Sequence, residues 1–242
     1  GTLHGLSRID KSGKVIAAYN NEPGNNKSLS GNNISSLFYS TGGQLWIGTA
    51  NSGLNLYNPV TKSFTRFKYN TGSKSGISSN RITSITKDKN GTTWVGTSNE
   101  GLNRVNIKNN SVEFINYKSS ELYPGTLPEN SIRLLFTDSG GNLKVITRNG
   151  FMCSYDYVND DFYAINLKDK GIKADIISVY AEKDFILFGT SGKGIYKLNI
   201  NTNKIIKHYL PPQLNNKIIV SILADGNNLW LGTNSGITRF NM

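Results

Sequence analysis

A tryptophan-centred motif recurs along the chain, and its spacing limits the folds that the sequence can adopt. The segment Leu-Trp-Ile-Gly-Thr at residues 45–49 returns as Trp-Val-Gly-Thr at 94–97 and as Leu-Trp-Leu-Gly-Thr at 229–233. Lys144 and Leu187 occupy the tryptophan position in two weaker copies, so the motif recurs after 48, 50, 43 and 43 residues. Repeats of this length are typical of propellers and of helical arrays.

Strand patterns decide between these two architectures. Each copy begins with a short, β-branched apolar segment that is too short for a helix, and a polar turn rich in Gly, Asn and Asp follows it. The tryptophan motif, a segment in which apolar and polar residues alternate, and a more polar segment complete the copy. In chain order we refer to the four segments as strands a, b, c and d. Four antiparallel strands per copy and no helical periodicity predict an all-β fold, a β-propeller of four-stranded antiparallel blades. Strand a is expected at residues 34–38, 82–85, 132–136, 176–180 and 218–222.

The copies divide the chain into about five to six blades. Residues 5–9 have the pattern of a strand c, and the chain stops at strand c of its last copy, so the two partial blades cannot merge simply into one. We therefore expect a fragment of a longer propeller array that residues outside this chain complete. The expected boundaries are a partial blade at 1–30, blades at about 31–76, 77–127, 128–170 and 171–213, and an incomplete blade at 214–242.

The charge balance raises the question of an anionic partner. The chain has 27 Lys and Arg residues against 16 Asp and Glu residues, a formal net charge of +11, which suits nucleic acid, an acidic glycan or a membrane surface. The positive residues occur in most turns, and no basic tract is interleaved with aromatic residues, so we expect no nucleic-acid partner. No apolar run approaches the roughly 20 residues that span a bilayer, so we expect membrane attachment only through segments outside this chain.

Residues suited to catalysis or metal binding are few. His4 and His208 stand alone, outside any cluster with metal-ligand spacing, and no phosphate-binding glycine motif precedes a helix. The lone Cys153 is expected to be a small core residue. The sequence therefore predicts no catalytic residue, no metal site and no cofactor.

The order Asn-x-Ile-x-Ser-Leu, a polar Gly turn, Leu-Trp-Ile-Gly-Thr, three spacer residues and Gly-Leu-Asn is clearest at residues 33–58 and 80–106. It resembles the two-component regulator propeller repeat. The resemblance implies a non-enzymatic, ligand-sensing module in the periplasmic ectodomain of an inner-membrane hybrid histidine kinase, with the kinase outside this chain. It further implies an oligosaccharide ligand, an acidic one among the options, contacts with other domains of the same sensor, and a homodimer formed through the full ectodomain.

Two other functions stay open. A propeller face can serve as a protein-protein interaction scaffold, and a lyase-type propeller enzyme shares part of the pattern. The enzyme alternative requires a histidine-bearing central site, which this sequence does not offer convincingly. Downstream sequence encoding a membrane span and a kinase would favour the sensor.

The ligand site is expected on the loops. In a four-stranded blade the d-to-a links and the b-to-c turns lie on one face, and the d-to-a links here are the long ones: 22–28, 69–74, 117–124, 168–170 and 209–213. Sugar recognition uses aromatic platforms and planar hydrogen-bonding groups. The candidates are Tyr69, Tyr117, Tyr123, Arg81 and Arg133. Alternatively, the tyrosines pack blade edges and the arginines pair with carboxylates.

The recurring tryptophans are assigned to packing rather than to binding. Trp46, Trp94 and Trp230 always fall in strand b, where a large apolar side chain can pack between adjacent blades. We expect all three to be mostly buried. Lys144 is the exception, and it marks either a blade with different packing or an edge where its ammonium reaches water.

Overall fold

A computed structural model of the protein describes residues 1–40, 43–109, 111–123, 125–211, 214, 217–226 and 228–241. These residues form 21 β-strands and no helix. The chain divides into two compact units, Gly1–Leu135 and Phe136–Met242. Each is described by itself.

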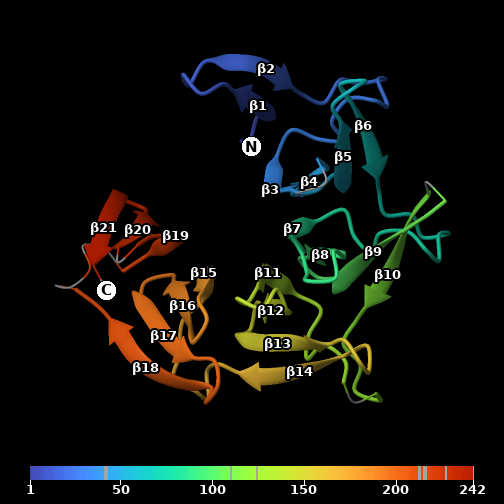
Figure 1. The fold of residues 1–242 in the computed structure, drawn as a ribbon. Coiled ribbons are helices and arrows are strands. Elements are labelled where there is room, and N and C mark those ends of the chain that lie inside the picture. Colours follow the sequence, from blue (N-terminus) through green and yellow to red (C-terminus); the bar gives the residue numbers. More distant parts are fainter. Residues whose placement is uncertain are drawn as a thin grey trace. The chain divides into compact units, whose positions relative to one another are not determined.

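The first unit holds one hairpin and two complete antiparallel sheets, each with its strands in chain order (Figure 1). The sheets follow the predicted order a, b, c, d. The hairpin is β1 (Leu6–Ile9) and β2 (Val15–Tyr19); the first sheet is β3 (Ile34–Tyr39), β4 (Leu45–Thr49), β5 (Leu54–Asn58) and β6 (Ser63–Phe67); the second is β7 (Ile82–Lys87), β8 (Thr93–Thr97), β9 (Leu102–Lys108) and β10 (Ser111–Tyr117).

The boundary between the units falls within β11, the first strand of the next sheet. Two four-stranded sheets and one three-stranded sheet follow the same order. They are β11 (Ile132–Thr137), β12 (Leu143–Thr147), β13 (Phe151–Asp156) and β14 (Asp161–Asn166); β15 (Ile176–Ala181), β16 (Phe185–Thr190), β17 (Ile195–Asn199) and β18 (Lys204–Tyr209); and β19 (Ile219–Asp225), β20 (Asn228–Thr233) and β21 (Gly236–Asn241). The predicted all-β architecture of antiparallel, mostly four-stranded propeller blades is confirmed.

The glycine of the repeated motif allows neighbouring sheets to approach each other closely. A Cβ atom on Gly48 in β4 would lie 2.5 Å from Cγ2 of Ile82, the first residue of the next sheet. No side chain fits at such a distance, so only glycine lets β4 pack against that isoleucine. The corresponding distances in two further copies are 2.6 Å between Gly96 and Ile132 and 2.9 Å between Gly189 and Ile219.

The tryptophan at the same strand fills the remaining space between sheets in the first unit. Trp46 has no exposed surface and packs in one core cluster with Ile82 and Val95 of the next sheet. Trp94 is also fully buried. The packing prediction is therefore confirmed for Trp46, and the burial prediction for both residues.

The burial prediction is wrong for Trp230, whose side chain is 39 % exposed. Among the described residues of the second unit, no sheet follows β19–β21 to cover the face on which Trp230 lies. Gly232 lies two residues after Trp230 in β20, on the same face of the strand. The nearest described atoms to a Cβ atom placed on it belong to Ser221 and Val220 of its own sheet. Burial of the motif tryptophan therefore depends on a neighbouring sheet.

The first residues repeat the end of the motif, which the sequence analysis did not recognise. Thr2 donates its hydroxyl hydrogen to the carbonyl oxygen of Gly5 at 3.1 Å, as the motif threonine does to a glycine carbonyl in four other copies. A Cβ atom on Gly1 would lie 2.5 Å from Cγ2 of Ile34, which is the relation of Gly48 to Ile82. The spacing Gly-Thr-x-x-Gly, shared with residues 232–236, is the sequence pattern that could have identified this turn.

A carboxylate at the a-to-b connection faces the motif position in three sheets, and in the last of them Trp230 donates to Asp225 Oδ2 at 3.3 Å. Trp94 donates its indole hydrogen to Asp88 Oδ2 at 2.8 Å. Lys144 replaces the tryptophan in the next sheet, and its Nζ lies 3.6 Å from Asp138 Oδ2 and 2.8 Å from Ser154 Oγ. The Lys144 side chain is only 14 % exposed. Lys144 therefore marks a sheet with different packing, and its ammonium is largely withdrawn from water.

The equivalent position in β3–β6 lacks the carboxylate, which leads to a stability prediction. Trp46 Nε1 is buried without a hydrogen-bond partner among the described residues, and Ser40, 1 % exposed, occupies the Asp88 position. Ser40→Asp is expected to supply that acceptor and to raise the free energy of unfolding by about 1 kcal/mol, as measured by chemical denaturation. The reverse change, Asp88→Ser, should lower it by about 1–3 kcal/mol. A folded Ser40→Asp protein with no gain would contradict this account.

Candidate functional site

The d-to-a links and the b-to-c turns lie at the same end of each sheet, as the sequence predicted. In the first unit the amide of Ala50 donates to the carbonyl of Asn33 at 2.9 Å, and the amide of Ser98 donates to that of Arg81 at 3.0 Å. In the second unit the amide of Ser191 donates to the carbonyl of Asp175 at 2.9 Å. We refer to this end of the sheets as the loop face.

Three links on the loop face, at residues 20–33, 68–81 and 118–131, share one design. In each, the side-chain oxygen of an asparagine two residues before strand a accepts a hydrogen bond from the amide of the second link residue. Each link also buries one aliphatic side chain beneath it. These hydrogen bonds run from the backbone amide to the asparagine Oδ1: Asn21 to Asn32 (2.6 Å), Tyr69 to Asn80 (2.9 Å) and Ser119 to Asn130 (2.8 Å). The buried aliphatic residues are Leu29, Ile77 and Leu127.

In the first two links a second asparagine, buried in strand c, anchors the link from inside the sheet. Asn103 has no exposed surface; its Oδ1 accepts from the amide of Ser78 at 2.8 Å. Its Nδ2 donates to Ser78 Oγ at 2.9 Å and to the carbonyl of Val95 at 3.3 Å. Asn55 makes the same three bonds with Ser30 and Ile47. We refer to these anchoring positions as the loop framework.

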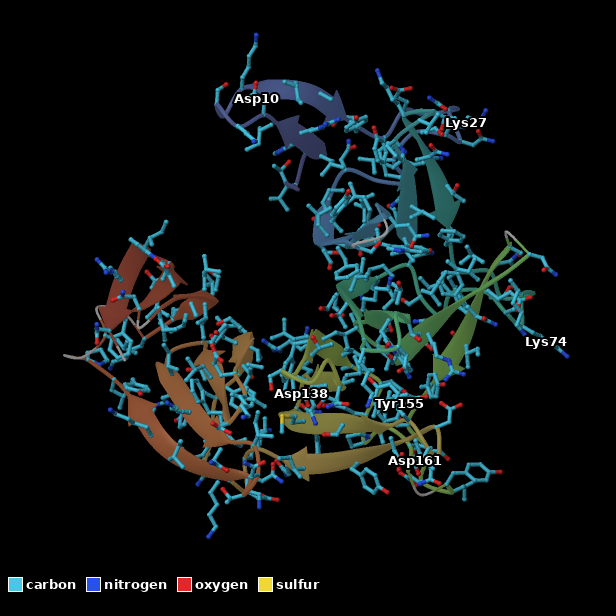
Figure 2. The ribbon with its side chains drawn as sticks, viewed as in Figure 1. Asp10, Lys27, Lys74, Asp138, Tyr155 and Asp161 are labelled. Atoms are coloured by element: carbon cyan, nitrogen blue, oxygen red, sulfur yellow. The ribbon has the colours of Figure 1, made fainter. Side chains whose placement is uncertain are left out.

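Between the framework positions, each link carries a six-residue segment that we refer to as its tip: residues 22–27, 70–75 and 120–125. Their sequences are Glu-Pro-Gly-Asn-Asn-Lys, Asn-Thr-Gly-Ser-Lys-Ser and Ser-Glu-Leu-Tyr-Pro-Gly, with Pro124 outside the described residues. Figure 2 shows the side chains of Lys27 and Lys74 projecting from the first two tips. The asparagine bond before strand a is common to the three links and the strand-c asparagine to the first two, while the tips differ in chemistry. This is the arrangement of a binding surface on a rigid scaffold.

The third tip borders a hollow of about 520 Å³ on the surface of the first unit. Tyr123 is 69 % exposed on this hollow, and its neighbour Leu122 is 83 % exposed. Thr126 braces the tip: its Oγ1 accepts from the amide of Ser120 at 3.1 Å and donates to the carbonyl of Tyr123 at 3.2 Å. The lining residues are Ser119, Ser120, Glu121, Tyr123, Gly125, Thr126, Leu127 and Pro128.

Two of the predicted binding residues lie together at the second link. Arg81 is exposed on the loop face, and its Nε lies 3.4 Å from Asn51 Oδ1 in the b-to-c turn of the preceding sheet. Tyr69 is 49 % exposed and is tied through its amide to Asn80, the residue before Arg81. Both side chains are accessible to a ligand.

The other predicted residues have different surroundings. Tyr117 ends β10 half-buried, with its ring centroid 5.5 Å from that of Trp94 and the Arg104 guanidinium 5.5 Å from its own. Arg133 is half-buried on β11. Only Tyr123 lies on the hollow. Glu121 and the three hydroxyl residues beside it were not among the predicted site residues, because nothing in their sequence pattern distinguishes them from other polar loop residues.

Groups with acid-base potential show no catalytic arrangement in the described part of the chain. No set of three or more His, Cys, Asp and Glu side chains there could hold a metal ion. The Tyr180 hydroxyl donates to Glu182, which raises the pKa of Tyr180 to about 12 and keeps the phenol protonated at neutral pH. The ring of His208 stacks on Tyr196 with centroids 3.8 Å apart. The described residues also contain no helix long and apolar enough to cross a membrane.

Comparisons with known proteins bear on the family and the fold. The family model described as two component regulator propeller matches residues 28–51 and 76–99, which contain Ser30 and Ser78, the partners of the two buried strand-c asparagines. No curated protein sequence matches the chain significantly.

Solved structures extend the likeness to almost the whole chain. The extracellular domain of BT3049 from B. thetaiotaomicron, described as a hybrid two component system, is 20 % identical, with a TM-score of 0.56 over 99 % of this chain and 40 % of that one. That of BT4673, similarly described, is 21 % identical, with a TM-score of 0.56 over 99 % and 38 %. PorZ, a surface component of the type-IX secretion system of Porphyromonas gingivalis, is 16 % identical, with a TM-score of 0.68 over 96 % and 35 %. The chain thus spans about two fifths of the length of these structures, and the likeness shows the fold.

Proposed function

Because the chain carries repeats of the two-component regulator propeller family, we propose that it is a ligand-sensing module from the extracellular part of a hybrid two-component sensor. Its fold is that of extracellular domains from two such systems. In this proposal the module is periplasmic and non-enzymatic, and the kinase lies elsewhere in the full protein. Ligand binding shifts the sensor between two states to the extent that the states differ in ligand affinity.

The observation that carries the proposal is the shared framework with dissimilar tips. An asparagine side chain before strand a anchors each of three links, and a buried strand-c asparagine adds to it in the first two, so a ligand need not order these links and the entropic cost of binding is reduced. The tips then present different side chains on one face. The hollow beside the third tip combines an exposed aromatic ring, Tyr123, with hydroxyl and carboxylate groups, which are the groups that recognise sugars. We therefore propose an oligosaccharide as the ligand.

The proposal is tested by calorimetry with oligosaccharides and variants of the exposed tyrosines. Tyr123→Ala is expected to weaken binding about two- to twelve-fold, because stacking on an aromatic ring contributes about 0.5–1.5 kcal/mol beyond its area burial. Tyr163→Ala is the matched control, since Tyr163 is 63 % exposed and belongs to a strand, β14, rather than to a link. Equal affinity of wild type and Tyr123→Ala would exclude the hollow as the sugar site.

The same titrations decide the remaining candidates. Loss of affinity in Arg81→Ala or Tyr69→Ala would place the second link in the site, and wild-type affinity in both Arg81→Ala and Arg133→Ala would remove the arginines from it. Tyr117→Phe keeps the ring that packs beside Trp94, so it tests the hydroxyl alone.

A protein-binding scaffold is the second candidate function. One observation favours it: Leu122, 83 % exposed at the third tip, is an apolar side chain of the kind that protein partners bury. Leu122→Ser should then abolish capture of a protein partner and leave oligosaccharide affinity unchanged.

A further inference from the structure

We infer that the hollow at the third tip binds a neutral or amine-bearing sugar and disfavours an acidic one, although the chain as a whole is strongly basic. The inference rests on the proposed sugar-sensing function and specifies the class of sugar. It differs from the expectation drawn from net charge, in which an acidic glycan was one option.

The first step is the charge of the lining itself. Glu121 is the one charged residue among the described residues that line the hollow, and no Lys or Arg lines it. The cation at the start of this link, Lys118, is engaged elsewhere: its Nζ lies 2.7 Å from Glu100 Oε2. A ligand in the hollow therefore faces a negative charge without a neighbouring cation to offset it.

The second step concerns the lysines elsewhere on the chain. Exposed charges act over about 8 Å at physiological ionic strength, so distant lysines contribute little to the potential inside the hollow. A carboxylate placed near Glu121 is repelled, whereas an ammonium in the same position is attracted. The net charge of +11 consequently does not predict the charge preference of this site.

The third step is hydrogen bonding. The hydroxyls of Ser120 and Thr126 already bond within the tip, to the amide of Leu122 at 3.2 Å and to backbone groups of Ser120 and Tyr123. The Glu121 carboxylate forms no hydrogen bond or ion pair with any described residue, and an ionised carboxylate only accepts. Because Glu121 is exposed, water supplies its donors in the free protein, and a ligand that displaces this water has to supply them instead. Sugar hydroxyls and ammonium groups are donors, and a sugar carboxylate is not.

The second tip offers a natural contrast. It carries exposed Lys74 and no acidic residue, so the two tips differ in the sign of their charge while sharing the framework bond to an asparagine. The sign of charge at a tip can therefore change without loss of the anchoring contacts. Glu121→Lys imitates this difference within the third tip.

The test uses the 242-residue chain and three tetrasaccharide probes matched in length: a glucosamine tetramer, cellotetraose and tetragalacturonate. Calorimetry on wild type should give the glucosamine tetramer the highest affinity and tetragalacturonate the lowest. Glu121→Gln should reduce the preference for glucosamine over cellotetraose about three-fold, the size expected for one exposed ion pair. Glu121→Lys should reverse the order of the glucosamine and galacturonate probes. Glu113→Lys makes the same charge change at an exposed residue of β10 and should leave the order of probe affinities unchanged.

The outcomes separate this inference from the function on which it rests. Tightest binding of tetragalacturonate by wild type, or an unchanged order in Glu121→Lys, would overturn the charge assignment while still supporting sugar sensing. Binding of none of the three probes by wild type would overturn the sugar-sensing function and this inference with it.

Discussion

Replacing Asn103 by alanine is expected to lower the free energy of unfolding by about 3–4 kcal/mol, among the largest effects of any single substitution in the chain. The side chain is fully buried and makes three hydrogen bonds, to the amide and hydroxyl of Ser78 and to the carbonyl of Val95. Removing it leaves these groups without their partner in a region that water does not reach, and each unsatisfied group costs about 1–3 kcal/mol, less whatever local relaxation recovers. Urea denaturation followed by circular dichroism measures the loss.

The third copy of the repeat supplies a matched rescue. At the spacing of Ser78 and Asn103 it has Pro128 and Cys153, and proline has no amide hydrogen that an acceptor must satisfy. Asn103→Cys alone should destabilise nearly as much as Asn103→Ala. The double variant Ser78→Pro, Asn103→Cys should recover part of the loss, because the unsatisfied amide is removed. If the double variant lost more free energy of unfolding than the two single variants lost in sum, the asparagine would not act through Ser78.

The framework was within reach of sequence reasoning, and the tips were not. The strands and the shared face of links and turns follow from period, alternation and turn residues, so comparing the copies within the chain was enough to predict them. The motif asparagines at positions 80 and 103 recur with the strands, and their recurrence indicates a structural role. Tip conformation depends on bonds such as that between Thr126 and Ser120, which no repeat pattern encodes.

The two tyrosines of the third link show the same limit. Both were equal candidates by residue type and position. Tyr117 packs because Trp94 and Arg104, on other strands of its sheet, lie against its ring. Tyr123 is exposed because it lies beyond the framework bond of Ser119 to Asn130. Register across strands decides between packing and exposure, and a single sequence does not reveal which neighbours a given register supplies.

Gly48→Ala is expected to lower the free energy of unfolding by about 2–3 kcal/mol, because overpacking a well-filled interface typically costs about 1–3 kcal/mol. The new methyl group would lie 2.5 Å from Cγ2 and 3.0 Å from Cβ of Ile82, and the second of these atoms is fixed to the backbone of the next sheet. The backbone of Gly48 has no positive φ, so the cost arises from packing between sheets and not from strain in the glycine.

Gly232→Ala is the matched control, since it makes the same change in the same motif, where the nearest described atoms belong to Ser221 and Val220 of its own sheet. Its new methyl group would meet Ser221 Oγ at 2.3 Å, an atom that can rotate away, and stability should change by less than about 0.5 kcal/mol. In a Trp230→Phe background, iodide quenching should then increase for Gly48→Ala, because Trp46 loses its cover when the sheets separate. If both glycine variants were equally destabilised, close approach of Gly48 to Ile82 would not explain the motif glycine. The strand would then require it for its own conformation.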